Sequence, residues 1–148
     1  LWHHSQSNQH FIDNAIAYMN LDDIRHQYID NLSGGQRQRA YIAMTLAQDT
    51  DYILLDEPLN NLDMKHSVQI MQVLRKLATE LNKTVVIVIH DINFASCYSD
   101  YIVAMKNGKL VHQGEVNHIM QSPVLQDIYD MAIPIQDIDD HKIAVYFR

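Results

Sequence analysis

Two acidic residues and a histidine follow directly after two apolar segments of the sequence. Asp56 and Glu57 come after residues 52–55, and His90 comes after the β-branched residues 84–89. Residues that follow neighbouring parallel strands meet at one edge of the sheet, where such folds bind ligands. A carboxylate there suits Mg²⁺, which takes oxygen ligands, and a second carboxylate can position or activate water. The spacing therefore predicts one crevice in which His90 contacts that water or a terminal phosphate.

The segment Ser33-Gly34-Gly35-Gln36 is a second candidate site. Its serine and glutamine, three residues apart, match a capping box, so a helix should begin here. Unsatisfied N–H groups and the helix dipole attract an anion to that end, so a phosphate could bind. Taken alone, this segment is more simply a turn and a helix cap. Any one of the three residues above is likewise more simply a solvated strand end, and it is their combination that favours a ligand site.

Apolar spacing predicts the elements that position these groups. Residues 11–19 match an amphipathic helix, with a further turn or two up to residue 31. A second helix begins at Ser33 and is interrupted near residue 49, before the strand at residues 52–55.

The second half of the predicted core is a βαβ crossover. Asp63 is placed to cap a helix of about 18 residues. Residues 84–89 are typical of a strand buried on both faces of a parallel sheet.

The remaining residues predict a scaffold without chemistry of its own. Asn107-Gly108 joins two short apolar segments and favours a β-hairpin, an antiparallel edge to the sheet. A last helix should begin at Ser122-Pro123 and end near residue 131. Residues 133–138 and 143–147 match a final strand pair.

Composition excludes several classes of partner. The chain has 148 residues, with 11 Lys+Arg against 18 Asp+Glu and a net charge of −7. This charge opposes nucleic acid. A single cysteine, Cys97, cannot form an internal disulfide, which fits a reducing cytoplasm. The apolar run 85–89 is far shorter than the roughly 20 residues that span a bilayer, so we expect no direct membrane insertion and a membrane role only through a partner. Nine histidines without consistent ligand spacing do not predict a structural metal site.

Four motifs, in order, resemble the ABC family of ATP-binding cassettes. Residues 32–39 (LSGGQRQR) resemble its signature, residues 52–58 its Walker B, residues 60–63 (NNLD) its D-loop and His90 its H-loop. The resemblance extends from about Phe11 to the end of the chain. It implies an α/β fold: a RecA-like parallel sheet with flanking helices, the end of the helical signature subdomain and an antiparallel edge hairpin.

The resemblance also implies roles for individual residues. Asp56 would help hold Mg²⁺ through water, Glu57 would be the base for the attacking water, and His90 would contact the γ-phosphate of ATP. In this family two cassettes close head-to-tail around two nucleotides. Ser33, Gly34, Gly35 and Gln36 would therefore face ATP held by the second cassette, and Asp63 would couple the two sites.

The chain departs from the family pattern in one large respect. It contains four glycines, Gly34, Gly35, Gly108 and Gly114, so no Gly-x-x-x-x-Gly-Lys-Ser/Thr can be written. We therefore expect a fragment that lacks Walker A and is inactive alone. Its expected parts are a loop or cloning remnant at residues 1–10, the end of the helical subdomain at 11–48, and the C-terminal part of the nucleotide-binding core at 49–148.

Two segments between the motifs suggest a subfamily. Residues 55–71 and 90–100 most resemble cassettes of iron–siderophore importers. The resemblance thus implies an ATPase subunit at the cytoplasmic face of the membrane, bound peripherally to transmembrane permease subunits. Two alternatives remain: a soluble ABC ATPase without a transport role, and a P-loop-less partner subunit that contributes only its signature loop in trans.

Overall fold

The computed structural model describes residues 6–147 of the chain and divides it into two compact units. The first is Leu1–Val88 and the second is Ile89–Arg148. The boundary that we expected at residues 48–49 stays a prediction. In the described part of the chain, no helix combines the length and apolar character needed to cross a bilayer.

The first unit begins with helix α1, Gln6–Tyr18. Residues 6–10 are helical, so the loop expected over residues 1–10 is wrong there, and residues 1–5 lie outside the described residues. Polar pairs one turn apart support this early start: Gln9 donates to Asp13 at 3.2 Å, and Asn14 lies 3.0 Å from His10. Apolar spacing alone does not detect such pairs.

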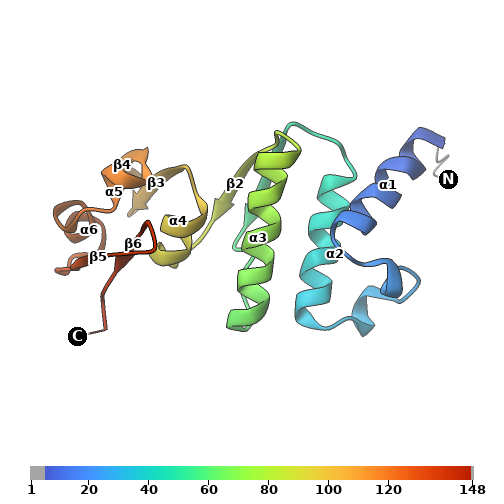
Figure 1. Ribbon diagram of the computed structural model, residues 1–148, viewed down its shortest axis with the longest axis horizontal. Helices are drawn as coiled ribbons and strands as arrows, with labels where there is room; N and C mark the ends of the chain where they lie inside the picture. The colour runs from blue at the N-terminus through green and yellow to red at the C-terminus, as the bar shows by residue number, and fades with distance from the viewer. Residues whose placement is uncertain (1–5, 148) are drawn as a thin grey trace. The chain divides into compact units, whose positions relative to one another are not determined.

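Two short 3-10 turns lead from α1 to the next helix. They are η1 (Asp22–Ile24) and η2 (Ile29–Asn31), and helix α2 (Gly34–Leu46) follows. Within this unit α1 packs against α2, and α2 against α3 (Figure 1). The buried apolar residues of α1, of the turn that follows it and of α2 include Ala15, Met19, Ile42 and Ala43.

The predicted βαβ crossover is confirmed. Strand β1 (Tyr52–Asp56) pairs in parallel with β2 (Thr84–Val88), and helix α3 (Met64–Glu80) connects them. Asp63 caps α3, as the sequence predicted. The helix packs against β2 and buries one apolar stripe, formed by Ile70, Met71, Leu74 and Leu77.

The expectation that residues 84–89 are buried on both faces is wrong. Every second residue of β2 is exposed, including Val86 at 51% and Val88 at 50%. Their partners on β1 are exposed on the same face, with Leu54 at 71%. The physical reason is that α3 covers one face of the strand pair, and in the described part of this unit the other face meets solvent.

Over its described residues, 89–147, the second unit holds two hairpins and three short helices. The helices are α4 (Ile92–Tyr98), α5 (Val116–Ile119) and α6 (Ser122–Tyr129). The strands are β3 (Tyr101–Lys106) with β4 (Lys109–Glu115), and β5 (Ile135–Ile138) with β6 (His141–Ala144).

Both predicted hairpins are confirmed, and their turns use residues in the left-handed region. In the described residues β3 and β4 pair with each other in a two-stranded sheet, so the place of this hairpin as an edge of the parallel sheet stays a prediction. Asn107 and Gly108 have φ of 50° and 73°, and Asp139 and Asp140 have φ of 47° and 64°. Two successive residues with positive φ match the right-handed twist of the strands they join.

Side chains from distant parts of the second unit enclose its core. The buried cluster comprises Ile92, Ala95, Ile119, Met120, Leu125, Ile133 and Ala144. Asn93 fastens α4 to β6, because its amide donates to the carbonyl of Ala144 at 3.1 Å and its carbonyl accepts the N–H of Ala144 at 2.7 Å. The hydroxyl of Ser96 also donates to the carbonyl of Lys142 at 2.6 Å.

Candidate functional site

The signature segment forms the start of helix α2. Ser33 is its N-cap: Oγ accepts the N–H of Gln36 at 3.3 Å, and the Gln36 side chain accepts the N–H of Ser33 at 3.0 Å. The predicted capping box is therefore confirmed. Because Oγ serves as an acceptor in the cap, the hydroxyl proton is the part of this side chain that suits an anion.

The preceding turn is fastened to the same helix. A guanidinium nitrogen of Arg37 donates to the carbonyl of Asp30, in η2, at 3.2 Å. A residue near the start of α2 thus fixes the position of the turn that precedes the signature segment.

The two glycines of the signature face the residues that precede and begin α3. A Cβ added to Gly34 would lie 3.8 Å from the carbonyl oxygen of Asn61 and 3.8 Å from a methyl of Leu62. Gly35 is buried, and a Cβ there would overlap the imidazole of His66, with Cγ only 2.9 Å away. A side chain at position 35 would therefore have to displace the imidazole, and glycine permits this close approach.

Asp63 joins the start of α3 to that imidazole. Its Oδ1 accepts the N–H of His66 at 2.8 Å and lies 2.7 Å from Nδ1 of the same residue. The backbone hydrogen bond from His66, and next the bond from its ring, lower the pKa of the Asp63 carboxyl below 3.8. The carboxylate is thus ionised near neutral pH, and Nδ1 is then the donor.

The two predicted carboxylates lie at the end of β1. Asp56 is the last residue of the strand and is exposed. Glu57 follows with a left-handed backbone, φ 48°, and its N–H donates to the carbonyl of Val88 at 3.2 Å. The amide of Asn60 donates to Oε2 of Glu57, so the carboxylate is held by the turn that follows it.

His90 is exposed and belongs to the second unit. The structure brings the other predicted site residues together in the first unit, in two groups. One consists of Ser33, Gly34, Gly35, Gln36 and Asp63, and the other of Asp56 and Glu57. The approach of His90 to either group stays a prediction. The next residue, Asp91, caps α4 by accepting the N–H groups of Asn93 and Phe94 at 2.8 and 3.0 Å.

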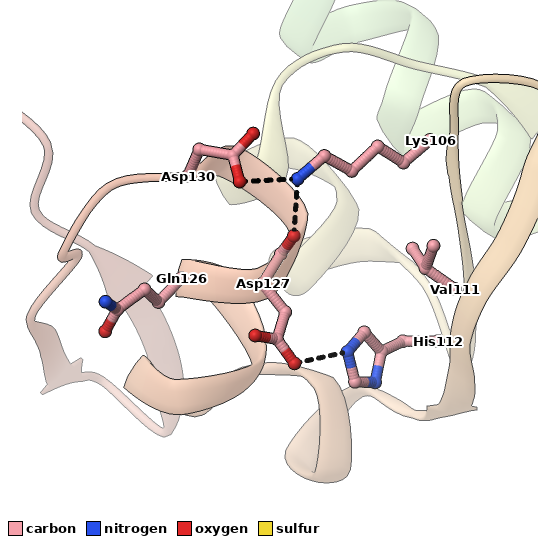
Figure 2. A pocket seen from close by; sticks show the side chains of 6 residues that line it. All are labelled: Lys106, Val111, His112, Gln126, Asp127 and Asp130. Atoms are coloured by element: carbon pink, nitrogen blue, oxygen red, sulfur yellow. Dashed lines mark hydrogen bonds and ion pairs between the residues drawn. The ribbon is translucent and has the colours of Figure 1, made fainter.

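A hollow of about 720 Å³ in the second unit holds a different cluster of polar groups. Figure 2 shows Nζ of Lys106 between Asp130 Oδ1, at 2.7 Å, and the carbonyl oxygen of Asp127, at 2.8 Å. Nε2 of His112 lies 3.3 Å from the Asp127 carboxylate. These groups pair with one another and fasten the β3–β4 hairpin to α6, a structural role.

The comparisons with known proteins agree with the geometry. A family model described as ABC transporter matches residues 3–60. The chain is 65% identical, over 136 residues, to the petrobactin import ATP-binding protein YclP of Bacillus subtilis (strain 168), covering 92% of this chain and 54% of that protein. Over 92% of its length, the chain is similar to part of an ATP-binding cassette of an ABC transporter.

Further relatives show the same relationship at lower identity. The ferric enterobactin transport ATP-binding protein FepC of Escherichia coli (strain K12) is 38% identical, over 85% of this chain and 46% of its own length. A solved ABC transporter in an inward-facing conformation superposes with a TM-score of 0.85 at 25% identity, over 97% of this chain and 59% of that one. The predicted α/β cassette fold is confirmed, and the chain spans about half the length of the curated relatives named here.

Sequence reasoning missed two residues of this cassette. Asn60 was assigned only to the D-loop, and His66 was set aside as a histidine without ligand spacing. Each lies three residues after a predicted site residue, Glu57 or Asp63. In a turn or at the start of a helix, a side chain can hydrogen-bond to the side chain three residues earlier. This spacing was the available signal for both residues.

Proposed function

We propose that the chain is part of the ATP-binding and ATP-hydrolysing subunit of an ABC importer for iron–siderophore complexes. The observation that carries this proposal is the 65% identity to a petrobactin import ATP-binding protein over 92% of the chain. The second relative, named for ferric enterobactin transport, supports the same class of cargo. Transmembrane permease subunits would be its partners, and it would bind peripherally at the cytoplasmic face of the membrane.

The carboxylates at the end of β1 fit ATP and Mg²⁺ chemically. Asp56 presents an exposed carboxylate directly after a parallel strand, and oxygen ligands of this kind are those that Mg²⁺ prefers. We assign Asp56 to Mg²⁺, through water. A bound Mg²⁺ supplies neutralisation of the charge that develops on the phosphoryl oxygens.

Glu57 is proposed as the base that takes a proton from the attacking water onto a carboxylate oxygen. Its left-handed backbone turns the chain sharply at the strand end, and Asn60 donates to its Oε2. A carboxylate with one oxygen held in this way keeps the other oriented toward a fixed point, which is what a base requires of its geometry. His90 is proposed to contact the γ-phosphate by hydrogen bonding.

The signature group is proposed to act on ATP held by a second cassette, head-to-tail. Gly34 and Gly35 place backbone N–H groups at the start of α2, where the helix dipole favours an anion, and the Ser33 hydroxyl adds a donor. Gln36 holds the cap that shapes this end of the helix. Asp63 would couple the two nucleotide sites.

The test uses a complete subunit, in which this chain is joined to the regions that its full-length relatives have outside the matched residues. Expressed in a strain that lacks YclP, it should restore uptake of ferric petrobactin, and the purified subunit should bind and hydrolyse MgATP. ATP hydrolysis without restored uptake would overturn the cargo assignment. The 148-residue chain should not hydrolyse ATP by itself, because phosphoryl transfer depends on a phosphate-binding loop and lysine that its sequence does not contain. Hydrolysis by that chain would require a different phosphate site.

A further inference from the structure

We propose that His66 is a positioning residue that couples the signature loop to the D-loop within one cassette; this rests on the function proposed above. One imidazole contacts both motifs. Its ring packs on the backbone of Gly35, and its Nδ1 binds the carboxylate of Asp63. The two motifs face a neighbouring cassette in the proposed dimer, so a shared contact would keep them in register when the dimer closes.

The contact at Gly35 leaves no space for the ring to move toward α2. Gly35 is buried, and a Cβ at that position would come within 3.2 Å of Nε2 and 2.9 Å of Cγ of the ring. Real side-chain atoms do not approach so closely without displacement of one partner. The ring edge therefore fits directly against the glycine backbone, and a ring that moves toward α2 must shift the first turn of that helix.

The contact at Asp63 fixes the orientation of the same ring. Oδ1 of Asp63 accepts two hydrogen bonds from His66, 2.8 Å from the backbone N and 2.7 Å from Nδ1. The backbone bond alone is sufficient to cap α3, and any residue at 66 except proline would provide it. The ring bond is additional, and it makes the orientation of the imidazole depend on the position of the carboxylate.

The structural alternative is that His66 only fills space beside the cap. Its side chain is 36% exposed, so it does not belong to the apolar core of the unit. A space-filling role would be preserved by any ring of similar size. The coupling role requires both the ring and the hydrogen bond, and this difference allows the two to be separated.

Three variants of His66 separate these contributions, each in the complete subunit carrying Glu57→Gln to prevent hydrolysis. His66→Phe keeps a ring against Gly35 without the bond to Asp63. His66→Asn keeps a short donor without the ring, and His66→Ala removes both. Gln72→Ala, an exposed position on the same helix, is the matched control.

We expect ATP affinity to stay within about 2-fold of the parent in every variant. The reason is that His66 contacts the motifs proposed to face the second cassette and not the nucleotide of its own cassette. ATP-dependent dimer formation, measured by light scattering, should weaken by about 5–150-fold in His66→Ala, the usual range of coupling between sites. His66→Phe and His66→Asn should each recover only part of this loss, and Gln72→Ala should dimerise normally. Normal dimerisation of His66→Ala, or full recovery by His66→Phe, would overturn the coupling role.

A second measurement needs no nucleotide. Amide hydrogen exchange at residues 35 and 36 is compared in the parent, Gly35→Ala, His66→Ala and the double variant. The added methyl must displace the ring, so Gly35→Ala should raise exchange strongly with His66 present and only slightly with His66→Ala. Additive effects would overturn the contact itself. If the parent subunit failed to bind ATP, the proposed function and the coupling would both fall, whereas non-additive exchange would still establish the contact.

Discussion

The two units of this chain differ in how completely they bury their apolar residues. In the first unit one face of the β1–β2 pair meets solvent, with Tyr52 and Leu54 exposed by 65% and 71%. In the second unit Leu125 is fully enclosed, and Asn93 satisfies both backbone groups of Ala144 from 51 residues away. In this chain, which spans about half the length of the relatives named above, the unit that carries most of the predicted chemistry has a sheet covered on a single side.

The two units also differ in where their polar side chains form hydrogen bonds. The second unit uses its polar side chains on its own backbone, through Asn93 and Ser96. The first unit concentrates polar contacts at strand and helix ends, at Glu57 with Asn60 and at Asp63 with His66. Contacts at element ends orient side chains and cap helices, so changes there should affect both function and, where a cap is lost, stability.

The largest expected effect is on the rate of ATP hydrolysis, which should depend on a residue of the first unit and not on one of the second. In the complete subunit, Glu57→Gln should lower the rate of ATP hydrolysis by roughly 10²–10⁴-fold, the usual contribution of a positioned base, while ATP still binds. Asp140→Asn, in the β5–β6 turn of the second unit, is the control and should leave the rate unchanged, because asparagine also accepts the left-handed backbone, φ 64°. Steady-state phosphate release measures both. Near-normal turnover by Glu57→Gln would remove this residue from the role of base.

The next effect compares equivalent truncations of two leucines. Leu125→Ala empties a site in the enclosed core of the second unit and should cost about 2–5 kcal/mol in the free energy of unfolding. Leu54→Ala acts on the exposed face of β1 and should change it by no more than about 0.5 kcal/mol. Urea denaturation of the 148-residue chain, followed by circular dichroism, gives both values. Equal costs would mean that the sheet face is covered in solution.

Asn93 tests the polar part of the second unit. Asn93→Ala leaves a partly buried N–H and C=O of Ala144 without this partner and should cost about 1–3 kcal/mol. Asn117→Ala, at an exposed position of α5, should be close to neutral. The same denaturation assay measures the two variants. A neutral Asn93→Ala would show that solvent reaches β6 and that this unit is less closed than its packing indicates.

Features set by short-range rules could be predicted from the sequence, and features set by tertiary contact could not. The capping box of Ser33 and Gln36 and the Asn107-Gly108 turn depend on neighbouring residues, and both were predicted. The solvent-exposed face of β2 was not predicted, since an apolar segment does not specify what covers it. The Gly35 to His66 contact was also missed, because it joins two helices that only folding brings together.

For the candidate site, sequence supplied the residue types and the structure supplied the partners. Asp56 and Glu57 were identified from their place after an apolar segment, whereas the amide that holds Glu57 was not. The left-handed backbone of Glu57 has no signal in a residue that is not glycine or asparagine. Sequence reasoning therefore identifies a carboxylate more readily than it identifies the orientation of that carboxylate.

The smallest expected effect concerns the acid stability of the first unit and the pKa of Asp63. The N–H of His66 and then its ring stabilise the ionised carboxylate, so its pKa in the folded chain lies below 3.8. A group with a depressed pKa contributes stability that is fully present above its unfolded value and is lost as the pH falls through its folded value. This contribution should therefore be constant at neutral pH and disappear only in the acid range, below about pH 4.

Carboxyl carbon chemical shifts, followed by NMR from about pH 6 to about pH 2, give the Asp63 pKa directly. His66→Ala should raise this pKa toward 3.8 without reaching it, because the backbone N–H of residue 66 still donates. Lys65→Ala should raise it less, since Lys65 acts only through the weakest of the contributing charges. An Asp63 pKa that is the same in the parent chain and in His66→Ala would mean that the imidazole does not bind Asp63 in solution. The cap of α3 would then act without the ring, and the orientation of His66 against Gly35 would need another cause.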